Sequence, residues 1–464
     1  MTNLIVEVSK YLMILLMAIY TYANFRFFSF PDLERKRKVC ARQNRAMFLL
    51  HFLAYVVMYL KTEDETLRRM LLVFYMGQVV FFLFYIYIYR FIYRNVSRLL
   101  VNNCCMLLAC GFIMLTRLSL DKGLDKAFKQ FVIVAAAAIL SWLVPFIMER
   151  FWQLYKFQWV YAGIGLAALL VVWVAGNESF GAQLSLTVGG ISIQPSEFVK
   201  ISFVFFVASM FYQSLDFKNI CITTVVAALH VVILVLSKDL GSALIFFVTY
   251  LVMLYVASRQ PLYFLGGLLA GSAAAWVAWK LFAHVQTRVL AWSDPFSVID
   301  KEGYQIAQSL FAIGTGGWFG LGINQGMPYK IPVVEQDFIF SAIAEEMGIL
   351  FALLLIFIYL SSFYMILNIA IVLKDSYYKL VAVGLGTLMI FQVFLSIGGV
   401  TKFIPSTGVT LPFVSYGGSS LLGSFLIWSV IQGMYLKRSD EVTKVEREAD
   451  EEKAKKEKKS KQSK

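Results

Sequence analysis

Carboxylates recur in one short stretch, VVEQDFIFSAIAEEMG (residues 333–348), where a polar segment gives way to an apolar run. Asp337 stands at the boundary, whereas Glu345 and Glu346 lie inside the run. A carboxylate in the position of Asp337 could act as a general base on an attacking hydroxyl group. It could equally cap the helix expected to start at Phe338, by accepting that helix's free backbone N–H groups. The residue types leave both roles open.

Glu345 and Glu346 are expected to be mainly structural. Glu345 lies eight residues after Asp337, roughly 12 Å along a helix, which is too far for the paired carboxylates of a glycosidase. An ionised side chain inside the bilayer costs about 2.5 to 3.5 kcal/mol on insertion scales and needs a partner. The candidate partners of the two glutamates are Lys200, Arg288 and Lys402.

The stretch QPSEFVK (residues 194–200) holds a second set of charges. Glu197 and Lys200 are three residues apart, so they lie on one face of a helix with opposite charge. They could neutralise each other, or they could line a polar cavity.

Two further stretches place polar groups beside apolar runs. SKDLGSA (residues 237–243) puts Asp239 at a break between two such runs; irregular backbone at membrane depth is tolerated only where protein or a watery cavity surrounds it. IPSTGVTLPFVSYGGSS (residues 404–420) includes Ser419 at the entry into the last apolar run. Its hydroxyl groups could pack helices together or bind a polar head group.

The elements that must position these side chains are membrane-spanning helices. Of the 464 residues, 59% are hydrophobic and 15% are charged, and the mean hydropathy is +0.70. Soluble domains are less apolar, and runs such as LIFFVTYLVMLYVA (residues 244–257) reach, with their flanks, the roughly 20 residues that cross a bilayer. The predicted fold is an all-α, polytopic integral membrane protein.

The net charge of +13 does not indicate a nucleic-acid partner, because the basic residues concentrate in short loops and in the tail, where they orient the chain in a bilayer. The five cysteines form no CxxC pair and no histidine stands at ligand spacing, so neither a disulfide framework nor a metal site is expected.

Thirteen spans are predicted, at about residues 5–24, 46–60, 70–92, 101–118, 129–148, 157–175, 197–212, 221–236, 240–257, 262–282, 338–372, 378–399 and 411–436. The odd-numbered loops carry most of the lysine and arginine, which predicts that they are cytoplasmic. The N-terminus and the loop 283–337 are then outside, and the charged tail 438–464 is cytoplasmic.

The loop 283–337 is expected to be ordered and functional, because loops of this length in compact proteins usually are functional when they are not disordered. It mixes aromatic residues with glycines, as in GYQIAQSLFAIGTGGWFGLGINQG (residues 303–326). Glycine permits positive φ and close backbone approach, which would suit a surface shaped against a large ligand.

Six of these stretches together resemble the SEDS family of bacterial shape, elongation, division and sporulation proteins (FtsW, RodA, SpoVE), and among them FtsW-like division proteins in particular. The matching pieces occur in the family's order: QPSEFVK, DLGSALIFF, DPF with GYQIAQSL, GTGGWFGLGINQG, DFIFSAIAEEMG and PSTGVTLPFVSYGGSS. The resemblance runs from about residue 101 to 437 and implies a ten-span core. Residues 1–100 then form an N-terminal extension with about three more spans.

The resemblance implies a peptidoglycan glycosyltransferase that polymerises lipid II at the outer face of the bacterial cytoplasmic membrane, with a class B penicillin-binding protein and other division or elongation proteins as partners. It implies that Asp337 is the catalytic acid that opens the DFIF block. The expected substrate-binding residues, for lipid II and its undecaprenyl pyrophosphate, are Glu197, Lys200, Asp239, Arg288, Gln308, Lys402 and Ser419. No cofactor is expected, except that a divalent cation could bind with the pyrophosphate.

The chain departs from the family pattern in two motifs. Leu184 and Ser185 replace the Arg-Trp pair that usually precedes the Gln-Pro-Ser-Glu block, and Pro332 is followed by Val333 where the family usually has Glu, with Glu335 nearby instead. Two other functions stay open: a lipid II flippase, and a non-catalytic scaffold of the division machinery. A flippase needs access from both faces of the membrane, whereas the motifs here gather at predicted outer ends.

Overall fold

The computed structural model describes residues 2–439 except 121–122, 152, 180–181 and 189–190. The long helices of the first half are α1 (Thr2–Phe28), α2 (Leu33–Lys61), α3 (Glu65–Ile92), α4 (Arg98–Ser119), α5 (Asp125–Arg150), α6 (Gln158–Ala175) and α7 (Ser196–Gln213). Those of the second half are α8 (Phe217–Leu236), α9 (Leu240–Ser258), α10 (Pro261–Leu281), α11 (Ala283–Ser293), α12 (Tyr304–Gly316), α13 (Ile339–Met347), α14 (Ile349–Val372) and α15 (Ser376–Val400), followed by a last helix, residues 418–439. Two short 3-10 helices, η2 (Leu154–Phe157) and η3 (Pro328–Lys330), complete the set.

Eleven of these helices are long and apolar enough to cross a membrane, which confirms the prediction of a polytopic membrane protein. Twelve of the thirteen predicted spans each correspond to one helix, and the span predicted over 338–372 covers two, α13 and α14. The two outside the set of eleven are α2, whose first half is rich in basic residues, and α7, which carries Glu197 and Lys200. The charged tail lies, from residue 440 onward, outside the described residues.

Two predicted spans differ from the helices observed. The span expected over 338–372 is broken at Gly348, which has φ +89° and separates α13 from α14. The span expected from residue 411 begins only at residue 418, because residues 411–417 form a turn and an irregular segment that includes Pro412. Proline cannot donate a backbone hydrogen bond, so it disfavours continuation of a helix.

A small antiparallel sheet interrupts the helical fold between α6 and α7. It contains β1 (Asn177–Ser179), β2 (Ala182–Val188) and β3 (Ile191–Ile193), in the order β1-β2-β3. Leu184 and Ser185, the residues that depart from the family pattern, both lie on β2, where Ser185 pairs with Asn177. The side chain of Leu184 is outside the described part of the chain.

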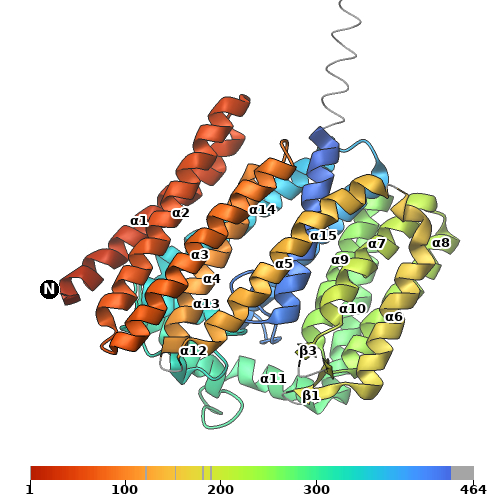
Figure 1. The fold of residues 1–464 in the computed structure, drawn as a ribbon. Helices are drawn as coiled ribbons and strands as arrows, with labels where there is room; N and C mark the ends of the chain where they lie inside the picture. The colour runs from red at the N-terminus through yellow and green to blue at the C-terminus, as the bar shows by residue number, and fades with distance from the viewer. Residues whose placement is uncertain (1, 121–122, 152, 180–181, 189–190, 440–464) are drawn as a thin grey trace, which may run out of the picture.

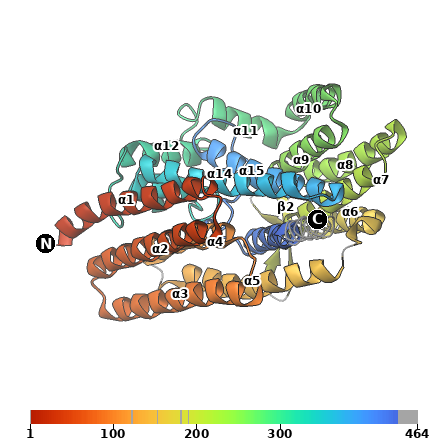
Figure 2. The same cartoon turned by 90° about the horizontal axis from the view of Figure 1, so that it is seen from above.

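Helix α4 is the central element of the N-terminal half, and all residues of its most apolar stretch are buried inside the protein. Helices α1 and α2 pack on each other and against α14 and α4, so the N-terminal extension lies directly on the rest of the bundle (Figures 1 and 2). Tyr20 on α1 donates to Asn103 Oδ1 of α4 (3.0 Å), and Asn103 Nδ2 donates to the hydroxyl groups of Ser361 and Ser362 on α14 (3.1 and 2.9 Å). Buried hydrogen bonds of this kind hold membrane helices together, because lipid tails are as apolar as the helix surfaces and the hydrophobic effect does not drive the helices to associate.

The segment between α10 and α13 folds along one end of the bundle, where Figure 1 shows α11 and α12 below the long helices. The first turns of α1 reach the same end, because the rings of Tyr11 and Phe319 lie 5.3 Å apart. The last helix ends at the opposite end, at the top of Figure 1. The prediction of an ordered loop between residues 283 and 337 is confirmed.

Candidate active site

Asp337 lies in the turn that precedes α13, half-buried and outside the helix itself. The helix begins at Ile339 with Phe338 as its N-cap residue, and no side chain caps its free N–H groups. The capping role considered for Asp337 is therefore wrong. Burial raises the pKa of Asp337 to about 6, the charge of Arg288 opposes that rise and the charge of Glu335 adds to it. The carboxylate can therefore exist in both protonation states close to neutral pH.

Arg288 lies within electrostatic range of two carboxylates. Its guanidinium group, half-buried on α11, donates from Nη1 to the backbone oxygen of Ser406 (3.1 Å). Burial lowers the pKa of Arg288, whereas the nearby charges of Asp239 and Asp337 raise it. The structure therefore brings Asp239, Arg288 and Asp337 into one electrostatic cluster, although they come from three different elements.

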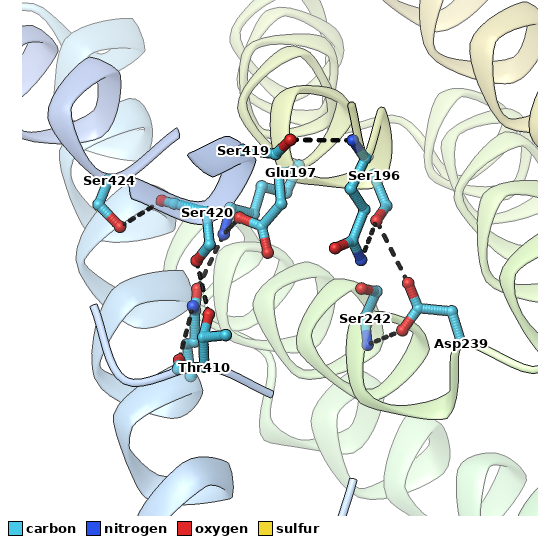
Figure 3. Close-up of polar contacts among 11 residues, drawn as sticks. Ser196, Glu197, Asp239, Ser242, Thr410, Ser419, Ser420 and Ser424 are labelled. Carbon is cyan, nitrogen blue, oxygen red and sulfur yellow. Dashed lines mark hydrogen bonds and ion pairs between the residues drawn. The ribbon is translucent and has the colours of Figure 1, made fainter. Parts of the chain in front are cut away.

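Asp239 joins the start of α9 to the start of α7. Its carboxylate accepts hydrogen bonds from the backbone N–H of Ser242 (3.1 Å) and from the hydroxyl of Ser196 (3.2 Å), as Figure 3 shows. Burial raises the pKa of Asp239, and the hydrogen bonds from Ser242 and Ser196 oppose that rise. The polar break predicted here is thus tied to α7 by a hydrogen bond.

Ser419, in the first turn of the last helix, lies beside the same group. Its hydroxyl oxygen accepts from the backbone N–H of Gln194 (2.9 Å), and Gln194 Nε2 donates to Ser196 (3.2 Å). Three helix starts, those of α7, α9 and the last helix, therefore meet at these side chains (Figure 3).

Glu197 and Lys200 pair with each other in the interior of the bundle. Lys200 Nζ forms an ion pair with Glu197 and also donates to Gln392 Oε1 (2.8 Å), and Gln392 Nε2 donates to the backbone oxygen of Thr410 (3.0 Å). Both charged side chains are buried. Of the two interpretations of this stretch, mutual neutralisation is the one that the structure supports.

Lys402 and Gln308 are less closely tied to the cluster. Lys402 has φ +59°, and its backbone oxygen accepts from Trp292 Nε1 (3.2 Å). Gln308 is half-buried on α12. For neither side chain does the described part of the chain provide a hydrogen bond or an ion pair to the cluster. Their assignment as substrate contacts stays a prediction.

Glu345 and Glu346 have structural partners, as expected, but the cation is none of the three candidates. Arg117 on α4 donates from Nε to Glu346 Oε1 (2.9 Å), and Arg117 Nη2 donates to the backbone oxygen of Gly326 (3.3 Å). The backbone N–H of Asn324 donates to Glu346 Oε2 (3.2 Å), and that of Met327 donates to Glu345 Oε1 (2.8 Å). The two glutamates thus hold the glycine-rich loop, residues 317–327, against α13.

Gly320 in that loop and Gly348 after α13 approach the protein's own backbone, so the expectation that the loop glycines face a ligand is wrong for Gly320. A Cβ atom on Gly320, which has φ +78°, would lie 2.4 Å from the backbone oxygen of Glu346. One on Gly348 would lie 2.5 Å from the backbone nitrogen of Gly320. Backbone N–H groups of Leu321 and Gly322 donate to the backbone oxygens of Glu345 and Glu346 (2.9 and 2.8 Å) across this contact.

Lys126 and Glu335 form a further ion pair beside Asp337 that sequence reasoning missed. The pair joins the first turn of α5 to the segment that carries Asp337, and the backbone N–H of Tyr416 donates to the backbone oxygen of Glu335 (2.7 Å). Gln130 on α5 donates from Nε2 to the backbone oxygen of Ser415 (3.2 Å). The only signal in the sequence was the unusual position of Glu335, two residues before Asp337.

The site has no group of metal ligands within the described ranges: no three His, Cys, Asp or Glu side chains gather closely enough to hold a metal ion.

Comparisons with known proteins bear on the family of this chain. Residues 97–439 match the family model FtsW/RodA/SpoVE, described as cell cycle protein. The chain is 32% identical over 358 residues to peptidoglycan glycosyltransferase RodA of Mycobacterium tuberculosis, covering 72% of this chain and 76% of the relative. It is also 32% identical over 344 residues to stage V sporulation protein E of Bacillus subtilis, covering 70% and 92%.

Solved structures share the fold. A structure described as showing the coordination of polymerization and crosslinking by a peptidoglycan synthase complex matches 74% of this chain and 98% of its own chain, with a TM-score of 0.64 and 24% identity. RodA of Thermus thermophilus matches 74% and 97%, with a TM-score of 0.55 and 23% identity. The resemblance drawn from the six sequence stretches is confirmed, and the chain belongs to the FtsW/RodA/SpoVE family of cell cycle proteins.

Proposed function

We propose that this protein is a peptidoglycan glycosyltransferase that polymerises lipid II at the outer face of the cytoplasmic membrane. The observation that carries the proposal is Asp337, a half-buried carboxylate with a pKa raised to about 6, beside the Arg288 guanidinium at one end of a membrane-embedded bundle. The names of the relatives, peptidoglycan glycosyltransferase RodA and probable peptidoglycan glycosyltransferase FtsW, support the reaction class.

The chemistry assigns one step to each of these groups. The 4-hydroxyl oxygen of a GlcNAc unit attacks the anomeric carbon of a MurNAc unit, and the bond from that carbon to undecaprenyl pyrophosphate breaks. Asp337 accepts the hydroxyl proton, and the departing pyrophosphate keeps the bonding electron pair. Arg288 is positioned to offset the negative charge that grows on the leaving group. A divalent cation, if the reaction uses one, would enter with the pyrophosphate.

The orientation proposed places residues 283–337 and the N-terminus outside and the C-terminus in the cytoplasm. The basic loops support it, because lysine and arginine accumulate on the cytoplasmic side of membrane proteins. The contact between Tyr11 and Phe319 agrees with it, since it puts the start of α1 at the end of the bundle where α12 lies.

The partner proposed is a class B penicillin-binding protein. One structural neighbour comes from a complex that coordinates polymerization with crosslinking. The present sequence contains no Ser-x-x-Lys followed by Lys-Thr-Gly, the serine-acylation motifs of penicillin-binding enzymes. Cross-linking is therefore assigned to a second chain, and other division or elongation proteins would join the same assembly.

The decisive experiment measures polymerisation of labelled lipid II by the purified protein with its penicillin-binding partner in detergent, where no flipping is required. Asp337→Asn is expected to abolish glycan strand formation. Asp300→Asn is the matched control, because it makes the same change at an exposed position in the same loop. A wild-type protein that forms no strands but moves labelled lipid II across vesicle membranes would favour the flippase, and strand formation by Asp337→Asn at the wild-type rate would exclude the general-base role.

A further inference from the structure

Four arginines lie near helix ends at the end of the molecule opposite the candidate active site (Figure 1): Arg37 on α2, Arg90 on α3, Arg98 on α4 and Arg438 on the last helix. Hydrogen bonds bring their elements together. The backbone N–H of Ser97 donates to Gln432 Oε1 and Gln432 Nε2 donates to the backbone oxygen of Ser97, both at 3.2 Å. Asn102 Nδ2 donates to the backbone oxygen of Cys40 (3.0 Å). The upper end of the bundle in Figure 1 holds the turn from α3 to α4 and the end of the last helix.

The charges of three of these arginines, Arg37, Arg90 and Arg98, act on one another. Arg90 lies close enough to Arg98 for their charges to repel, and Arg98 lies in the same relation to Arg37. Arg90 and Arg98 both lie near the Cys40 thiol. The Tyr435 ring, which lies 5.7 Å from Arg438 Cζ, is also within range of that thiol.

Nearby carboxylates do not neutralise the group. Asp32 pairs with Arg35, Glu34 pairs with Lys38, and Asp375 pairs with Lys437. In the part of the chain that the structure describes, none of the four arginines forms an ion pair.

Two of the four guanidinium groups have a buried N–H with no partner. The Nε atoms of Arg90 and Arg438 are both buried, and neither finds a hydrogen-bond acceptor among the described residues. A buried donor without an acceptor destabilises a protein by about 1 to 3 kcal/mol, more when the group is charged. Orienting the chain in the bilayer needs basic residues only in the loops, so it does not explain why the Nε atoms of Arg90 and Arg438 are buried without an acceptor.

We propose that this arginine cluster binds a phosphate-bearing anion, with Arg90, Arg98 and Arg438 as direct contacts and the exposed Arg37 at the entrance. The planar fork of a guanidinium group matches the oxygens of a phosphate, and several such groups together recognise it tightly. The cluster lies near the ends of three candidate spans, α3, α4 and the last helix, where a spanning helix meets the lipid head groups, so the assigned ligand is the head group of an anionic phospholipid. In the proposed orientation this lipid belongs to the cytoplasmic leaflet.

The test follows the melting temperature of the full-length protein in detergent during separate titrations with phosphatidylglycerol, with phosphatidylcholine of the same acyl chains, and with inorganic phosphate. Phosphatidylglycerol is expected to raise the melting temperature at concentrations where phosphatidylcholine does not. Arg98→Gln and Arg438→Gln should each weaken the apparent affinity for phosphatidylglycerol about fivefold, as expected for one basic residue near an anionic lipid surface.

Arg69→Gln is the matched control, because it removes the same charge from the other end of α3, where Arg69 is exposed and pairs with Glu65. A response to inorganic phosphate that Arg98→Gln removes and Arg69→Gln keeps supports the site with a soluble anion as its ligand. Equal responses of Arg98→Gln, Arg438→Gln and Arg69→Gln, or equal effects of the two lipids without any phosphate response, would overturn the proposal. Arg98→Lys, which keeps the charge, checks that loss of binding is not loss of folding.

Discussion

Asp337 combines burial with two opposed charges, and this combination should set the pH range of the enzyme. With a pKa of about 6, the carboxylate is a base above that pH and is protonated below it. We expect the polymerisation rate to fall about tenfold per pH unit on the acid side, as for one essential base. Glu335→Gln removes a charge that raises this pKa, so it should move the acid limb to lower pH, and Arg288→Gln should move it to higher pH. A limb that stays in place in both variants would assign the proton transfer to another group.

The carboxylate of Asp337 should lower the free energy of unfolding at neutral pH. The pKa of Asp337 is raised from 3.8 to about 6 on folding, so between these values the unfolded chain ionises while the folded one does not, and stability falls as the pH rises. The full loss, on the order of 3 kcal/mol, is present at pH 7 and absent below pH 3.8. Asp337→Asn should therefore melt at the same or a higher temperature than wild type at pH 7, with a difference that disappears at low pH. A lower melting temperature for the variant at pH 7 would assign a structural role to Asp337.

At the scale of single elements, α13 depends on a buried ion pair. Glu346 is fully buried against Arg117, and removing one member of such a pair costs about 3 to 5 kcal/mol because the other charge is left unpaired. Glu346→Gln should lower the melting temperature and reduce activity only in proportion to the folded protein. Replacing both residues with apolar ones should be less harmful than the sum of the single changes. Glu302→Gln, at an exposed position, is the control, and activity lost by Glu346→Gln at full folded yield would point to a direct catalytic role.

The glycine-rich loop and the helix α12 that precedes it should respond differently when a glycine gains a methyl group. Gly320→Ala would place a Cβ 2.4 Å from the Glu346 backbone oxygen at a positive φ, whereas Gly314, within α12, has open space around it. We expect Gly320→Ala to lower the melting temperature by several degrees. Gly314→Ala should raise it slightly, because alanine in a helix is favoured over glycine by about 0.8 to 1 kcal/mol. Thermal unfolding of the two variants side by side checks both signs.

The sequence predicted which helices exist more accurately than it predicted how they pack together. Apolar run length located the helices of all thirteen predicted spans, since each crossing needs about 20 apolar residues whatever lies beside it. It could not show the break at Gly348, because a glycine within an apolar run does not reveal its φ. Nor could it pair Glu346 with Arg117, which is 229 residues away. The small sheet between α6 and α7 was also missed, because its three strands have only three to seven residues.

Local motifs indicated part of the candidate site, and the roles of its residues stay predictions. The motifs placed Asp337, Asp239 and Arg288 among the functional residues, and the fold brings their charges together. They did not indicate Lys126, because its role depends on an ion pair with Glu335 that forms only when α5 packs beside the turn before α13.

At the scale of the whole molecule, α1–α3 and the remaining helices should melt as one unit. Asn103 links α1, α4 and α14 through three buried hydrogen bonds. Such bonds contribute about 0.6 kcal/mol each in membrane proteins. Asn103→Leu should therefore destabilise the protein by about 2 kcal/mol and lower a single melting transition. Asn368→Leu is the control, because Asn368 is only half-buried and its side chain donates only to Tyr364 of its own helix. Two separate transitions in the wild-type protein would mean that the N-terminal helices fold independently.

The burial of α4 also fixes an order of events during synthesis. The hydrogen-bond partner of Asn102, Gln43, precedes it by 59 residues, so this partner is already made when α4 leaves the ribosome. The serine partners of Asn103 are 258 and 259 residues ahead. Because synthesis proceeds at roughly 5 to 20 residues per second, on the order of 10 to 50 seconds pass between the synthesis of α4 and that of these serines. During that interval Tyr20, made 83 residues earlier, can already occupy the Asn103 carbonyl oxygen. The first helices therefore give the nascent chain a partly satisfied polar helix to insert, long before α14 exists to cover it.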